Sequence, residues 1–146
     1  MSQFIGTRMP EGFAGTLTRG EFDYTAETKV NGGLTAYGVP VKIDASTGKA
    51  VPCTATSDVV HGFTMREVGQ SNLTGIALAP VISILRRGYL LVSAEGTPAV
   101  GGQVYLSATG TLTADAGSEP NNTAIPGCKF CKAKNAEGLV EIEFNI

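Results

Sequence analysis

The last eight residues of the chain read Leu139-Val140-Glu141-Ile142-Glu143-Phe144-Asn145-Ile146. Apolar side chains occupy every even position from 140 to 146, and polar side chains occupy the odd positions between them. This period of two is typical of a β-strand with one buried side and one solvent-facing side. Chain ends fray unless other elements hold them. The pattern therefore predicts a strand fixed in a sheet, with Glu141 and Glu143 on its solvated or salt-bridged face.

Short runs of Val, Ile, Thr, Tyr and Phe, separated by Gly and Pro, recur through the rest of the chain. No window carries a sustained helical period. Such runs predict an all-β fold, a single compact β-barrel or jelly-roll-like sandwich. About nine short strands are expected, over 21–30, 34–43, 50–53, 59–68, 81–94, 101–106, 111–114, 125–134 and 139–146.

Three of these segments carry a more specific prediction. Pro40 cannot donate to a ladder, so the strand over 34–43 is expected at a sheet edge. The segment 81–94 is apolar on both faces and predicts a central strand, with a bulge or bend at Gly88. Gly110 separates two short runs, so 101–106 and 111–114 are expected to form a hairpin.

Residues 1–20 predict an extended N-terminal arm, and residues 21–146 the β-domain. The arm has apolar residues without helical spacing, and Met9-Pro10-Glu11-Gly12 interrupts regular structure. It could wrap its own domain or lie on a partner. Fixing twelve backbone residues costs roughly 12–24 kcal/mol. Offsetting that cost takes on the order of 500–1,000 Å² of apolar burial at roughly 25 cal/mol per Å², which favours a partner surface.

Charge and hydropathy exclude several classes of partner. The formal net charge is −2 and only 16% of residues are charged, so no basic surface for nucleic acid is expected. No apolar stretch is long enough to span a membrane. The N-terminus lacks the pattern of a signal peptide, so synthesis and folding in the cytosol are expected. A sparsely charged surface is typical of a protein that packs against neighbours.

The chain shows no motif for catalysis or for a cofactor. Cys53, Cys128 and Cys131 are an odd number of thiols, which argues against a disulfide framework. Cys128 and Cys131 have the spacing of a zinc or redox motif, but only Cys53 and His61 could complete a metal site. We expect no metal, buried thiols and a hydrogen-bonded His61. No nucleophile elbow and no phosphate-binding loop is present.

Arg86 and Arg87 are adjacent in a predicted strand, so their side chains should point to opposite faces. One of them would then face the interior or a subunit contact, where it needs a carboxylate or carbonyl partner. The possible carboxylate partners are Asp23, Glu141 and Glu143. Alternatively, this end of the strand extends beyond the core, and both arginines are exposed to solvent.

Five motifs in order point to one family. They are Met9-Pro10-x-Gly12-x-x-Gly15-x-Leu17-Thr18-Arg19, Ala36-Tyr37-Gly38-Val39-Pro40-Val41-Lys42, Leu85-Arg86-Arg87-Gly88-Tyr89-Leu90-x-Val92, Gly101-Gly102-x-Val104-Tyr105-Leu106 and Glu141-Ile142-x-Phe144-Asn145-Ile146. With these motifs nearly the whole chain resembles the structural cement, or capsid decoration, proteins of tailed bacteriophages. The three cysteines depart from the family's pattern.

The resemblance implies a virion protein without enzymatic activity. It implies that the chain sits on the outer surface of the icosahedral shell and clamps neighbouring major capsid subunits. A homo-dimer and a homo-trimer both remain open, as does the symmetry axis. We expect the interface to draw on the arm and the arginine pair, namely Phe4, Ile5, Arg8, Met9, Phe13, Arg19, Arg86 and Arg87. The alternative is a virion-surface module that recognises a host surface or a carbohydrate, but Trp is absent and only four Tyr could offer platforms.

Overall fold

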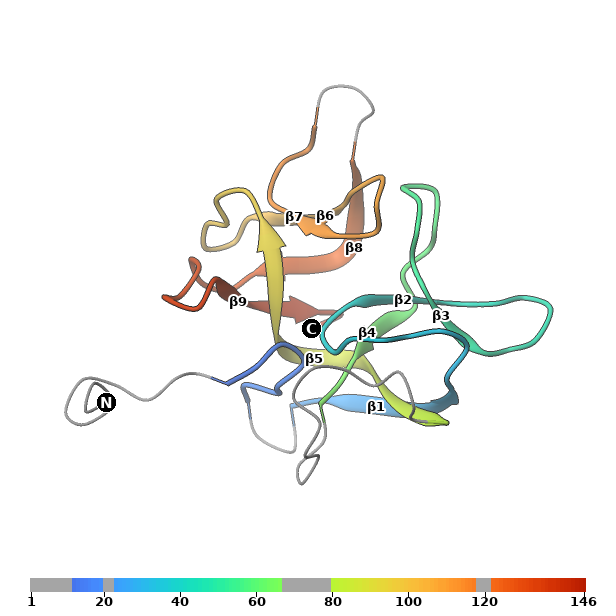
Figure 1. Cartoon of the computed structure of the whole chain (residues 1–146). Coiled ribbons are helices and arrows are strands. Elements are labelled where there is room, and N and C mark those ends of the chain that lie inside the picture. The colour runs from blue at the N-terminus through green and yellow to red at the C-terminus, as the bar shows by residue number, and fades with distance from the viewer. Residues whose placement is uncertain (1–11, 20–22, 67–79, 118–121) are drawn as a thin grey trace, which may run out of the picture.

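The computed structural model describes residues 12–19, 23–66, 80–117 and 122–146. Within these residues it contains nine strands and no helix, which confirms the predicted all-β class (Figure 1). No helix in the described ranges is long and apolar enough to cross a membrane. The strands are β1 (Thr25–Val30), β2 (Pro40–Ile43), β3 (Ala50–Pro52), β4 (Gly62–Thr64), β5 (Val81–Glu95), β6 (Gln103–Leu106), β7 (Leu112–Thr113), β8 (Thr123–Phe130) and β9 (Leu139–Phe144).

Five strands close into a barrel in the order β5-β9-β8-β6-β7, with β7 returning to β5. All pairs are antiparallel except β5 and β7, which run parallel from the pair Ala94–Leu112. The hairpin predicted around Gly110 is confirmed, since Leu106 lies opposite Leu112. The barrel is filled by apolar side chains from all its strands, among them Leu90, Val104, Leu112, Phe130 and Ile142.

The other four strands form a second sheet together with β5, in the order β3-β2-β4-β5-β1. A parallel bridge between Asn31 and Ala50 brings the end of β1 back to β3. A separate, smaller core lies inside this sheet and contains Leu34, Tyr37, Val41, Ala50, Ile82 and Ile84. The described residues therefore form two hydrophobic cores.

The long strand β5 belongs to both sheets (Figure 1). Its first half pairs with β1 and β4, and its second half pairs with β9 and β7. The change of partners falls at Gly88, whose φ of 143° suits glycine. A Cβ at this position would lie 2.7 Å from the Tyr24 Cβ. The bend predicted at Gly88 thus coincides with the junction of the two sheets.

Several strand predictions were too long. Among the described residues, the regular strand within 59–66 is limited to β4 and that within 34–43 is limited to β2, and β8 ends at Phe130 although a strand was predicted to residue 134. Residues 67 and 68 of the first prediction lie outside the described residues. The edge position predicted from Pro40 was wrong, because β2 lies between β3 and β4. Pro40 is tolerated there because it is the first residue of the strand, and its carbonyl accepts a hydrogen bond from the Cys53 N–H at 3.3 Å.

The closing segment also differs from its simple alternation. Glu141 was expected on a solvated or salt-bridged face. It is salt-bridged, but its side chain is only 3% exposed. Ile146 was expected on the buried face and is 54% exposed. The strand ends at Phe144, and Asn145 adopts a φ of 56°, so the alternation does not continue to Ile146.

Candidate interaction surfaces

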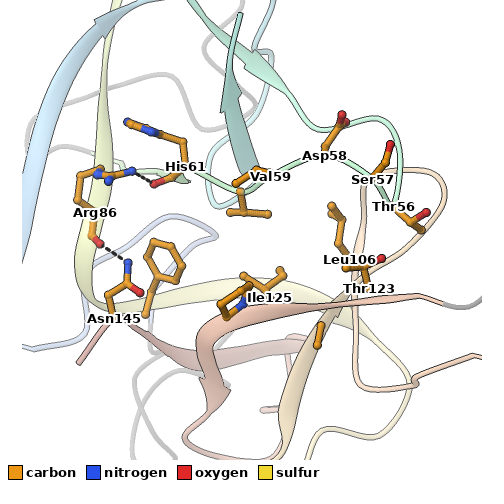
Figure 2. Close-up of a pocket in the computed structure, with 14 residues that line it drawn as sticks. Thr56, Ser57, Asp58, Val59, His61, Arg86, Leu106, Thr123, Ile125 and Asn145 are labelled. Atoms are coloured by element: carbon orange, nitrogen blue, oxygen red, sulfur yellow. Dashed lines mark hydrogen bonds between the residues drawn. The ribbon is translucent and has the colours of Figure 1, made fainter. Parts of the chain in front are cut away.

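A groove of about 540 Å³ opens between the segment 56–61 and the start of β8 (Figure 2). Its deep part is apolar and consists of the buried side chains Leu106, Ile125 and Phe144. Val59 projects over it and is 82% exposed, the largest exposed fraction among the big apolar side chains of the described residues. Exposed apolar area gathered over a hollow is typical of an interaction site.

The segment that carries Val59 is held by one carboxylate. Asp58 forms a salt bridge with Lys42, with 2.9 Å between Oδ1 and Nζ. Its Oδ2 accepts hydrogen bonds from the backbone N–H groups of Thr54 at 2.8 Å and Ala55 at 3.0 Å. The hydrogen bond from Lys42 is the main cause that lowers the pKa of Asp58. These bonds form a turn, and the turn presents Val59 to solvent.

One end of the groove is polar. Arg86 donates a hydrogen bond to the His61 carbonyl, and Asn145 Nδ2 donates to the Arg86 carbonyl at 3.0 Å (Figure 2). The His61 Nε2 contacts Glu27 Oε1. Burial, the largest single influence, favours the protonated form of Glu27. The hydrogen bond and charge of His61, together with the charges of Lys29 and Arg86, outweigh it, so the pKa of Glu27 lies below its ordinary value. His61 is a hydrogen-bonded residue in this network.

Arg86 and Arg87 separate as the strand geometry requires. Arg86 is half-buried at the groove, and Arg87 is exposed. A carboxylate or a carbonyl partner was expected for an inward arginine, and the carbonyl is confirmed, because Arg86 donates to the carbonyl of His61. Of the carboxylate candidates, Glu141 pairs with another arginine.

That other arginine is Arg19. Its Nη2 lies 3.2 Å from Glu141 Oε1, and its guanidinium lies 3.9 Å from the centroid of the Tyr89 ring. Burial of Glu141 favours its protonated form, but the hydrogen bonds and the positive charge of Arg19 hold its pKa below the ordinary value. Arg19 was proposed as an interface residue, and in the isolated chain it covers a buried carboxylate of the barrel.

The segment before Arg19 lies on β5. The Gly15 N–H donates to the Leu91 carbonyl at 2.8 Å, and the Leu91 N–H donates to the Thr16 carbonyl at 3.0 Å. Leu17 forms an antiparallel bridge with Leu90. The described end of the predicted arm, residues 12–19, is therefore attached to the protein's own barrel.

Phe13 lies at the outer end of this segment and is 52% exposed. The Arg66 guanidinium lies between two rings, 5.4 Å from the centroid of Phe13 and 4.3 Å from that of Tyr37. Phe13 thus offers an apolar contact beside a stacked cation. The other predicted arm residues, Phe4, Ile5, Arg8 and Met9, lie outside the described residues.

The thiols are poorly suited to chemistry. Cys53 and Cys128 are buried and Cys131 is half-buried. Burial raises the pKa of Cys53 and of Cys131 to about 11, and raises the pKa of Cys128 further. Raised pKa values leave little reactive thiolate at neutral pH. Among the described residues, no three His, Cys, Asp or Glu side chains are grouped so that they could hold a metal ion.

The sequence did not reveal the groove. Its walls come from segments far apart in the chain, and Val59-Val60 followed by His61 resembles the start of a strand. The only local signal is Asp58 directly before two valines, which is compatible with a turn.

Comparisons with known proteins cover the whole chain. A family model described as "Structural cement protein (E217 gp24/Pam3 gp6)" matches residues 1–145. Among solved structures, a chain from "The capsid of Myoviridae Phage XM1" superposes with a TM-score of 0.76 at 17% sequence identity. That match covers 99% of this chain and 97% of the other. No curated protein matches significantly.

Proposed function

The chain belongs to the structural cement protein family of phages, and from this premise we propose that it binds the outer surface of the capsid and clamps neighbouring major capsid subunits. The observation that carries the proposal is the extent of the family match, which runs from residue 1 to residue 145 and so includes the predicted arm. The protein would be part of the virion after synthesis in the host cytoplasm.

The described surface supports a role in adhesion. Val59 and Phe13 expose apolar area at separate places, over the groove and beside Arg66. The pKa of each thiol is raised. The thiols are consequently not activated as nucleophiles.

The proposed mechanism is stabilisation by mass action. A protein that binds assembled subunits, and not dispersed ones, shifts the equilibrium towards the shell. Each contact can be modest, because a homo-dimer or homo-trimer that engages several subunits gains effective concentration.

Co-sedimentation with mature shells that lack this protein tests the proposal. Deletion of residues 1–12 leaves the bonds of Gly15 and Thr16 to β5 in place, so we expect a folded β-domain by circular dichroism. We expect its binding to shells to weaken tenfold or more, about 1.4 kcal/mol per decade. Failure of the full chain to bind shells would refute the proposal, and unchanged binding after deletion would remove the arm from the clamp.

Two exposed valines provide a matched test of the groove. Val59 is 82% exposed at the groove, and Val100 is 77% exposed in the turn that follows β5. We expect Val59→Asp to weaken binding to shells and Val100→Asp to leave it unchanged. Equal effects of the two variants would exclude the groove as a specific contact.

A further inference from the structure

β1 leaves one side of its backbone available. The strand pairs with β5 along one edge, and no other strand of the described residues pairs with residues 26–30. Beyond them, Asn31 bridges to Ala50 of β3. Ala26, Thr28 and Val30 are exposed. An edge strand of this kind can pair with a further strand.

The hydrogen bonds identify which groups point outward. The Asn31 N–H donates to the Pro80 carbonyl at 3.0 Å, in the direction of β5. Backbone groups alternate in direction along a strand, so Lys29 and Glu27 also direct their backbone groups towards β5. Ala26 and Thr28 direct theirs away from the sheet, which places two successive donor and acceptor sets on the open edge.

A second copy of the same strand fits this edge in one favourable antiparallel register. Outward-pointing residues must face outward-pointing residues, so the registers near the middle of the strand place Thr28, Glu27 or Lys29 opposite itself. The second choice opposes two carboxylates and the third opposes two ammonium groups, and both are destabilising. The first choice places Glu27, whose carboxylate also contacts His61 of its own chain, opposite Lys29 of the second copy, and Lys29 opposite Glu27 of that copy.

The limits of the free edge agree with this register. The pairing with β5 is irregular between Thr25 and Ala26, and the bridge to β3 begins at Asn31. The open segment is therefore 26–30, and its centre is Thr28. Charges often protect edge strands against association, but here the two charges have opposite signs in a self-complementary order.

An apolar contact lies beside the same edge. Val30 pairs with Val81 of β5, and these side chains are 50% and 51% exposed. In the favoured register, Val30 faces Ala26 of the second copy. The area buried by a five-residue ladder alone is small compared with the roughly 1,200 Å² buried in a stable interface. The side chains of Val30 and Val81 should therefore add to the buried area.

We propose that β1 pairs antiparallel with β1 of a second copy about a twofold axis at Thr28, which gives a homo-dimer with one continuous sheet. Only the purpose of the dimer rests on the proposed function, because two linked copies would bind the shell with avidity. The pairing of the two strands does not depend on that function. A capsid strand on this edge, or a trimer, is an alternative that the experiments distinguish.

Cross-linking of the full chain tests the register. Directly opposed, hydrogen-bonded residues have Cα atoms about 5.5 Å apart, within the range of a disulfide of roughly 4.4–6.8 Å. We expect Thr28→Cys to form covalent dimers under mild oxidation. Val100→Cys and the unchanged chain, with its native thiols, serve as controls. A monomer at micromolar concentrations and above, a trimer by sedimentation velocity, or cross-linking no greater than in the controls would overturn the proposal.

Charge exchange tests the contact independently. In the Lys29→Glu variant, four carboxylates would lie close together at the twofold axis. We therefore expect the affinity between the two copies to fall tenfold or more. The double variant Glu27→Lys with Lys29→Glu restores opposite charges and should restore the dimer relative to Glu27→Lys alone, which is the matched control because both variants lose the contact of Glu27 with His61. Lack of rescue in a folded double variant would refute the register. Shell binding by a monomeric variant would leave the proposed function standing, whereas a dimer that ignores shells would refute that function alone.

Discussion

The ring of Phe144 is expected to be one of the main contributors to stability. It is 3% exposed and meets Phe63 edge to face, with ring centroids 5.1 Å apart at an interplanar angle of 87°. Removal of a buried Phe ring costs about 3–5 kcal/mol, of which about 0.5–1.5 kcal/mol belongs to the aromatic pair. Against a typical stability of about 5–15 kcal/mol, Phe144→Ala should be severely destabilising.

Denaturant and thermal unfolding measure this effect. For a domain of this size, 3–5 kcal/mol corresponds to a fall in Tm of roughly 6–20 °C. Glu143→Ala is the matched control on the same strand, and we expect it to cost less than about 0.5 kcal/mol because that side chain is partly exposed. Equal costs of the two variants would contradict the burial of Phe144.

A double-mutant cycle separates the ring contact from burial. Phe63→Ala and Phe144→Ala should be non-additive by about 0.5–1.5 kcal/mol, the energy of the edge-to-face pair. Additive effects would refute a direct contact between the rings.

Two further predictions concern the barrel and its turns. The depressed pKa of Glu141 gives stability that is present above its unfolded value of about 4.5 and is lost as the pH falls through the folded value. Unfolding free energies measured from pH 7 downwards should therefore fall more steeply for the unchanged chain than for Glu141→Gln, and parallel curves would exclude this contribution. Gly110 and Gly101 have similar φ values of 83° and 79°, but a Cβ would lie 1.9 Å from the Cys53 carbonyl oxygen at Gly110 and would meet nothing within 4 Å at Gly101. Gly101→Ala should cost about 1 kcal/mol from backbone strain and Gly110→Ala distinctly more, and a chemical denaturation curve giving equal costs would contradict the close approach.

Local sequence patterns predicted the framework of the fold. The strand at 139–144, the hairpin around Gly110 and the special position of Gly88 depend on neighbouring residues, and each has a counterpart in the structure. Of the two alternatives for Glu141, a solvated or a salt-bridged side chain, the sequence did not identify the second, because its partner Arg19 lies 122 residues away in the chain. A pattern of near neighbours carries no information about such a contact.

The candidate interaction surfaces could be predicted less well from the sequence. Val59 was placed in a strand because it is β-branched and precedes an alternating run, but Asp58 turns the chain by binding two backbone N–H groups. The groove then depends on how that turn meets β8 and Phe144. The open edge of β1 follows from the strand order, which no segment of the sequence specifies alone.

The strand that two sheets share has a mechanical consequence. Tension on the sheet that contains β1 would reach the barrel through the continuous backbone of β5, without passing through side-chain packing. In the barrel, β5 is held by β9 from Gly88 to Ser93 and by β7 at Ala94 and Glu95. To pull β5 out along its axis, both ladders must be sheared together. A subunit held by either sheet would thus resist being torn in two at Gly88.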